Sequence, residues 1–150
     1  MASNAFDFTD VFKQIETEIN KVMNSAEMKK RLSENMAFAA FEHVYPLYHE
    51  TEYKRRKASG GLGDPNNYEV TTEYLQMTVV NETTGNGEQP GESWTSAPIN
   101  DIIEQGEGYG WRHSEIYESQ PYPRPFMQQG IDEFTDDFLL PEIRSKVFND

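Results

Sequence analysis

The feature that most constrains the fold is a change in the spacing of apolar residues along the chain. Between residues 8 and 45, apolar side chains recur at steps of three and four, which is the period of an amphipathic helix. Near residue 68 the spacing changes to two, the period of a β-strand. A chain that contains both periods predicts an α+β fold. The helical stripe consists of Phe8, Val11, Phe12, Ile15, Ile19, Val22 and Met23, followed by Met28, Leu32, Met36, Ala39, Ala40 and Val44.

Ser25 and Pro46 divide and end this helical region. Serine is a favoured N-cap residue, and Glu27 would lie in the first turn that follows it. Proline disfavours helical geometry in the residue before it, so Pro46 closes a second helix over about 26–45. The sequence therefore predicts a helix pair, and one long helix remains the alternative if the chain does not break at Ser25.

The rest of the chain alternates between turn-rich connectors and short regular elements. Residues 46–67 form a connector, residues 68–82 are predicted as strand, and residues 83–96 as a flexible polar loop. A last helix is predicted over about 126–138, resuming after Pro141. We expect a single domain over 1–150, with the N-terminal helix or helix pair and the C-terminal helix packed on a small antiparallel sheet.

The charge is large and unevenly distributed. The net charge is −13, and residues 59–150 carry all of it, because residues 1–58 hold nine acidic and nine basic residues. Such a surface repels phosphates, which argues against general DNA binding. It suits a wall past which DNA slides without specific binding. No run of residues approaches the roughly 20 apolar residues of a membrane span.

No pattern of catalytic or metal-binding residues stands out. The chain has no cysteine, which excludes disulfides and thiolate ligands. Of its three histidines, His43 and His49 are six residues apart with a proline between them, unlike the i, i+4 pairs of helical zinc sites, and His113 stands alone. The glycine-rich segment at 60–65 lacks the Walker pattern and is predicted as a tight turn. We therefore predict no metal site, no cofactor and no enzymatic activity.

Two segments together resemble a known family. The first is Tyr53-Lys54-Arg55-Arg56-Lys57 followed by Gly60-Gly61-Leu62-Gly63-Asp64, and the second is Tyr122-Pro123-Arg124-Pro125-Phe126-Met127. The chain resembles the tail-component, or head–tail joining, family of long-tailed bacteriophages, whose members act at tail completion or in the neck. The resemblance implies an N-terminal helix, a Gly-Leu turn, a small antiparallel sheet with a long hairpin loop and a closing helix.

The second segment also has a direct physical interpretation. Pro123 and Pro125 fix an extended backbone before the last helix. Phe126 can then insert into the core at the first helical turn. Arg124, between the prolines, can reach a carboxylate or backbone carbonyls.

The resemblance implies a structural virion protein that works through protein–protein contacts. We expect copies of the chain to form a ring and to contact neck, portal-side or tail-tube proteins, in the virion and, during assembly, in the host cytoplasm. A ring requires two different patches that meet. The predicted contacts join the basic cluster, Lys54, Arg55, Arg56 and Lys57, to the acidic group, Asp132, Glu133, Asp136 and Asp137, although a solvated acidic face is the alternative. The competing function is an acidic regulatory or inhibitory module that covers a basic target.

Overall fold

Residues 8–47, 57–83, 88–89, 92–93, 103–104 and 123–148 are described by the computed structural model, and every element named below lies within them. The chain begins with helices α1 (Thr9–Met23) and α2 (Ala26–His43). They are separate helices, because the Ser25 side chain accepts a 3.2 Å hydrogen bond from the Met28 N–H and caps α2. The helix pair is therefore confirmed. A short 3-10 turn, η1 (Tyr45–Leu47), contains Pro46 and follows α2.

The predicted strand over 68–82 is in fact a hairpin. Strands β1 (Tyr68–Glu73) and β2 (Gln76–Asn81) are antiparallel, with Tyr68 opposite Asn81. The turn residues Tyr74 and Leu75 have φ values of 27° and 55°. Positive φ at both central positions belongs to type I′ turns, which usually carry Asn-Gly. Because that signature is absent, the sequence pattern did not reveal the turn.

Helix α1 holds this unusual turn in place. The Tyr74 hydroxyl donates a 2.8 Å hydrogen bond to the Glu16 carboxylate, and the Leu75 N–H donates a 3.3 Å hydrogen bond to the side-chain oxygen of Asn20. Bulky residues at positive φ are strained, and they persist where surrounding contacts fix the backbone. The hairpin turn therefore depends on α1.

The C-terminal helix runs without the predicted break. It consists of α5 (Phe126–Phe134), the π-helical segment η3 (Thr135–Leu139), α6 (Leu140–Ile143) and the π-helical segment η4 (Arg144–Phe148). The predicted interruption between Phe138 and Pro141 is absent, because the chain continues helically through Pro141. The proline ring would clash with the carbonyl four residues before it, and the wide turns of η3 relieve this clash.

The wide turns lie where this helix packs on the core. Phe134 is buried in the core, and the partly buried residues packed against it further along the helix are Phe138, Leu139 and Ile143. The contact with the core therefore continues through η3 into α6.

Only part of the predicted flexible loop at 83–96 is described. Thr83 is buried, and its N–H donates a 2.9 Å hydrogen bond to the Asn81 side chain. Two very short strands, β3 (Glu88–Gln89) and β4 (Glu92–Ser93), form an antiparallel pair. Residues 84–87, 90–91 and 94–96 lie outside the described residues.

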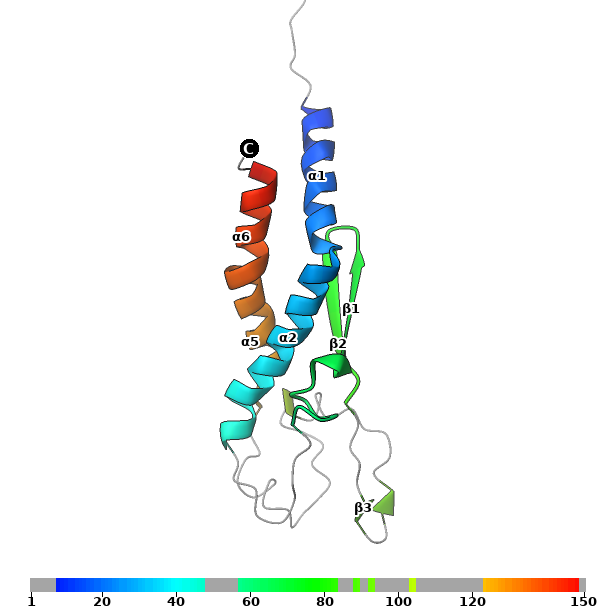
Figure 1. The fold of residues 1–150 in the computed structure, drawn as a ribbon, viewed down its shortest axis with the longest axis vertical. Coiled ribbons are helices and arrows are strands. Elements are labelled where there is room, and N and C mark those ends of the chain that lie inside the picture. Colours follow the sequence, from blue (N-terminus) through cyan, green and yellow to red (C-terminus); the bar gives the residue numbers. More distant parts are fainter. Residues whose placement is uncertain are drawn as a thin grey trace, which may run out of the picture.

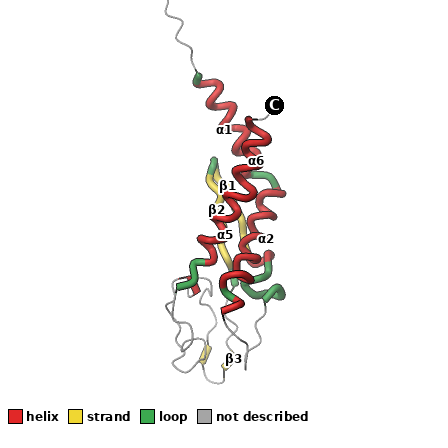
Figure 2. Tube along the Cα trace, turned by 90° about the vertical axis from the view of Figure 1, so that its left-hand side faces the viewer, coloured by secondary structure: helices red, strands yellow, loops and turns green. Residues whose placement is uncertain are grey.

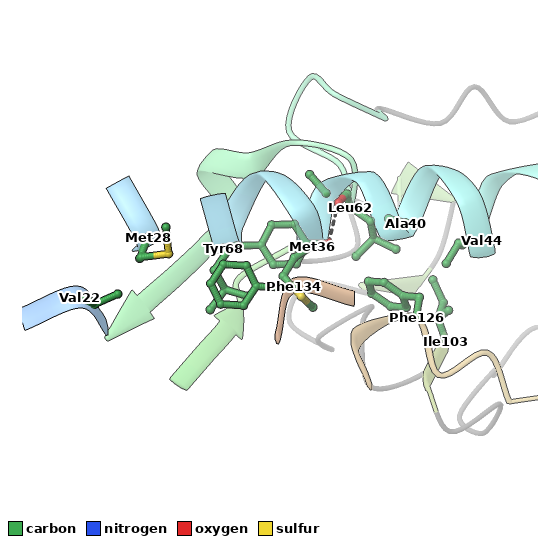
Figure 3. Packing of buried hydrophobic residues seen from close by; sticks show 12 residues of the cluster. Val22, Met28, Met36, Ala40, Val44, Leu62, Tyr68, Ile103, Phe126 and Phe134 are labelled. Atoms are coloured by element: carbon green, nitrogen blue, oxygen red, sulfur yellow. Dashed lines mark hydrogen bonds between the residues drawn. The ribbon is translucent and has the colours of Figure 1, made fainter. Parts of the chain in front are cut away.

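Helix α2 lies at the centre of the fold. It packs against α5 on one side and against β1 on another (Figures 1 and 2). Figure 3 shows Phe134 beside Met36 of α2, and Phe126 beside Ile103. The α+β prediction, with N-terminal helices, a C-terminal helix and a small antiparallel sheet, is confirmed. The buried cluster consists of Val22, Met28, Leu32, Met36, Ala37, Ala40, Val44, Leu62, Tyr68, Ile103, Phe126 and Phe134.

The molecule is elongated, and one of its ends is built from two helices. Helix α1 extends past the hairpin, and the end of the C-terminal helix lies beside it, in contact through α6 and η4 (Figures 1 and 2). Among the residues that the structure describes, no helix combines the length and the apolar character needed to cross a membrane.

Candidate functional site

The Pro-Arg-Pro-Phe segment is a structural anchor. The Phe126 side chain is 0 % exposed, which confirms its predicted insertion into the core. The backbone N–H of the buried Arg124 donates a 3.0 Å hydrogen bond to the Ile103 carbonyl. The Glu104 carboxylate accepts hydrogen bonds from the Met127 and Gln128 N–H groups, at 3.1 and 3.4 Å. Glu104 thus caps α5, a role that no short-range sequence signal indicates.

Backbone N–H groups of the glycine-rich turn donate to a carboxylate of the same turn. Asp64 accepts a 2.8 Å hydrogen bond from the Gly60 N–H and a 3.0 Å hydrogen bond from the Asn66 N–H. The Gly60 N–H, followed by the Asn66 N–H, lowers the pKa of Asp64 below its usual value. The Gly63 N–H donates to the Tyr45 hydroxyl at 2.9 Å. Three backbone donors of this segment are therefore satisfied internally, as expected for a tight turn.

The predicted basic cluster is mostly outside the described residues. Lys54, Arg55 and Arg56 belong to the segment 48–56, which the structure does not describe. Lys57 is exposed and has a φ of 45°. A contact made by this cluster therefore stays a prediction.

The four acidic residues of the predicted contact, which lie at 132–137, do not form a single surface. Asp132, Asp136 and Asp137 are exposed, and Asp132 accepts a 2.9 Å hydrogen bond from the Gln128 side chain. Glu133 is half-buried and faces α2 instead, where its carboxylate lies 3.3 Å from Nε2 of His43. Three of the four are thus available to a partner.

His43 therefore has Glu133 as a neighbour, which the spacing of His43 and His49 does not indicate. One nitrogen of its imidazole ring, one carboxylate oxygen of Glu42 and one of Glu133 all lie within 4.8 Å of one another. Glu133 is 90 residues away in the chain, so no local spacing could indicate this cluster. His49 lies outside the described residues.

Apolar side chains gather at the two-helix end of the molecule. Phe8, the residue before α1, is 53 % exposed, and Val11 and Phe12 within α1 are 46 % and 61 % exposed. Phe148 at the end of the C-terminal helix is 59 % exposed. The Phe8 and Phe12 rings have centroids 6.3 Å apart. We call these four residues the apolar tip. They continue the stripe of α1, whose other end is buried at Val22 and Met23.

These features define a small α+β protein whose conspicuous surfaces are an exposed apolar tip and a set of exposed carboxylates, both suited to contacts with other proteins. A family model described as YomN matches residues 7–147. The chain belongs to the YomN family, a phage-derived family. Comparison with curated proteins and with solved structures gave no match.

Proposed function

We propose that this protein is a structural component of the virion that helps to join head and tail in the neck or at the head-proximal end of the tail. It does so by contacts with copies of itself and with neighbouring neck, portal-side or tail-tube proteins. The observation that carries the proposal is the apolar tip. Membership of a phage-derived family and the resemblance of the Pro-Arg-Pro-Phe segment to head–tail joining proteins support it.

The apolar tip has the character of a protein-binding surface. Contiguous exposed apolar patches on a folded protein commonly mark interaction sites. Three of its four side chains are phenylalanines, and burying one such side chain contributes about 1.5–3 kcal/mol. The buried residues of α1 are Val22 and Met23 in its last turn, and Glu16 and Asn20 hold the hairpin turn. The apolar residues at the start of the helix are exposed instead. The exposed apolar side chains at this end therefore offer a surface to a neighbouring protein.

The charge distribution indicates which surfaces of neighbouring copies can meet. Identical copies with a net charge of −13 repel one another, so association requires a complementary patch. In a cyclic ring, one patch meets a different patch on the next copy. The basic cluster at 54–57 meets Asp132, Asp136 and Asp137 in our proposal. Glu133 takes the smallest part in this contact, because it faces His43 within its own subunit.

Complementation of a phage that lacks the gene tests this function. A Phe8→Ser/Phe12→Ser variant should leave heads and tails unjoined in electron micrographs of lysates. Phe38→Ser is the matched control, because Phe38 is also an exposed phenylalanine, at 54 %, but lies on α2. The control should restore infectious particles.

Two outcomes would contradict the proposal. Normal particles from the doubly substituted variant, with the protein folded, would show that the tip is not needed for joining. Purified virions that lack the protein would favour the inhibitory module instead. Charge reversal at Lys54, Arg55, Arg56 and Lys57, followed by rescue with basic substitutions at 132, 136 and 137, tests the second contact separately.

A further inference from the structure

A cluster of three side chains joins the end of α2 to α5, and head–tail joining does not require it. We propose that Glu42, His43 and Glu133 bind one divalent first-row transition-metal ion, of which Zn²⁺ is the best fit. Glu42 and His43 come from the last turn of α2, and Glu133 comes from the second half of α5. The donor atoms are one imidazole nitrogen and two carboxylate oxygens, all within 4.8 Å of one another.

The spacing of His43 and Glu133 suits two ligands of one ion. Bonds of about 2.0–2.1 Å to a tetrahedral metal place two ligand atoms roughly 3.3–3.4 Å apart. The distance from His43 Nε2 to the Glu133 carboxylate is 3.3 Å. A direct charge-assisted hydrogen bond is usually shorter, at about 2.7–2.9 Å. The separation of the pair, which also permits a direct hydrogen bond, thus fits two ligands of one tetrahedral ion.

Glu42 can complete the set by a small movement. Its side chain is exposed and its carboxylate oxygen already lies within 4.8 Å of the other two donor atoms, so rotation can bring it to the roughly 3.4 Å edge of a tetrahedral site. Three protein ligands leave a fourth position for water, which is the arrangement of an open zinc site.

The location favours a cation. Helix α2 ends at His43, and the carbonyl groups in the last turn of a helix carry partial negative charge. Two carboxylates offset the double charge of the ion. The half-buried positions of His43 and Glu133 strengthen the attraction compared with that between fully exposed groups. An ion here would tie together residues 90 positions apart in the chain.

The donor set selects among metals. Imidazole suits zinc, copper, nickel and iron, whereas magnesium and calcium prefer oxygen ligands alone. The chain has no cysteine, so the site offers no soft sulfur ligand. Ligation through Nε2 leaves Nδ1 with the proton, and the imidazole must be neutral to bind.

Competition with a chromophoric zinc chelator tests the site on the full chain after removal of metal with EDTA. We expect one Zn²⁺ per chain and an increase in Tm that Mg²⁺ and Ca²⁺ do not reproduce. His43→Gln, Glu133→Gln and Glu42→Gln should each weaken zinc binding at least about tenfold, because each removes a ligand. The increase in Tm should disappear with them.

Matched controls separate this site from others in the chain. His49→Gln and His113→Gln change the two remaining histidines and should leave zinc affinity unchanged. Should His43→Gln or Glu133→Gln not fold, Glu42→Gln still decides the matter, because Glu42 is exposed. No saturable binding by the original chain would overturn the proposal. Equal affinity in Glu42→Gln, or loss of binding in His49→Gln, would overturn it as well.

Discussion

The side-chain amide of Asn35 donates a 2.7 Å hydrogen bond to the backbone carbonyl of Gly130, which lies 95 residues further along the chain. This bond marks the close approach of α2 and α5. A Cβ atom on Gly130 would lie 3.0 Å from Cβ of Ala39 and 3.0 Å from Sδ of Met36. The absence of a side chain at residue 130 therefore lets the two helices approach this closely.

Substitution of Gly130 by alanine should destabilise the protein. Overpacking of this kind costs about 1–3 kcal/mol, and the higher helix propensity of alanine offsets about 1 kcal/mol. We expect a net loss of roughly 1 kcal/mol in the free energy of unfolding, measured by urea denaturation. Ala39→Gly in the Gly130→Ala background should lessen the crowding between the helices, whereas Gln129→Ala, on the exposed side, should have little effect. Unchanged stability in Gly130→Ala would show that the helices can move apart freely.

Phe126→Ala should be much more damaging, because its ring is fully buried between α2 and the segment at Ile103. Loss of a buried phenylalanine side chain costs about 3–5 kcal/mol. Lys57→Ala, at an exposed position, should change stability by no more than about 0.5 kcal/mol. Chemical denaturation of both variants measures this difference, and equally small effects would refute the anchoring role of Phe126.

The hairpin turn offers a stabilising change. Replacing Tyr74-Leu75 with Asn-Gly should release the strain of two non-glycine residues at positive φ and raise stability by roughly 1 kcal/mol. The variant loses the exposed hydrogen bond from Tyr74 to Glu16, a small cost. Thermal unfolding measures the gain. Glu16→Gln in both backgrounds reports the worth of that bond, and a lower Tm for the Asn-Gly variant would contradict the strain interpretation.

Asp64 should make the 60–66 turn sensitive to acid. Its pKa is below the ordinary value of 3.8, because the Gly60 N–H first and the Asn66 N–H second stabilise the charged form. The folded protein thus holds the proton less tightly than the unfolded chain. The stabilisation is complete above about pH 4, the unfolded value, and is lost as the pH falls through the lower folded pKa.

Amide hydrogen exchange at Gly60 and Asn66 tests this expectation. Protection should fall as acid protonates Asp64, after correction for the pH dependence of intrinsic exchange. Asp64→Asn should show reduced protection that no longer changes across this range. A variant with the acid response of the original chain would indicate that another group is responsible.

The helices and their caps could be predicted from the sequence because local chemistry determines them. Ser25 caps α2 as its residue type predicts, and Phe126 enters the core at the first turn after the prolines. The hairpin was missed because Tyr74 and Leu75 are not turn residues, and the turn depends on Glu16 and Asn20 of α1. A contact between residues so far apart in the chain cannot be recognised from a short stretch of sequence.

The candidate site was less predictable for the same reason. The acidic run at 132–137 could be read as one surface, but helical geometry turns Glu133 toward His43 and leaves Asp132 exposed. The exposure of the first turns of α1 could not be predicted from the sequence either. Its apolar stripe predicts a buried face, while Phe8 and Phe12 extend past the core that would cover them. Periodicity indicates which side of a helix is apolar but not what lies against it.

The π-helical turns of η3 and η4 affect how the sequences of this family should be aligned. A π-helical turn contains one residue more than an α-helical turn while the chain before and after it continues as helix. A relative with one residue fewer between 135 and 148 would regain ordinary helical turns and still bring its last residues to the same contact with α1. A single-residue gap in this part of a family alignment would then mark an insertion that widens one helical turn. Such an insertion would leave the end of the chain in the same position.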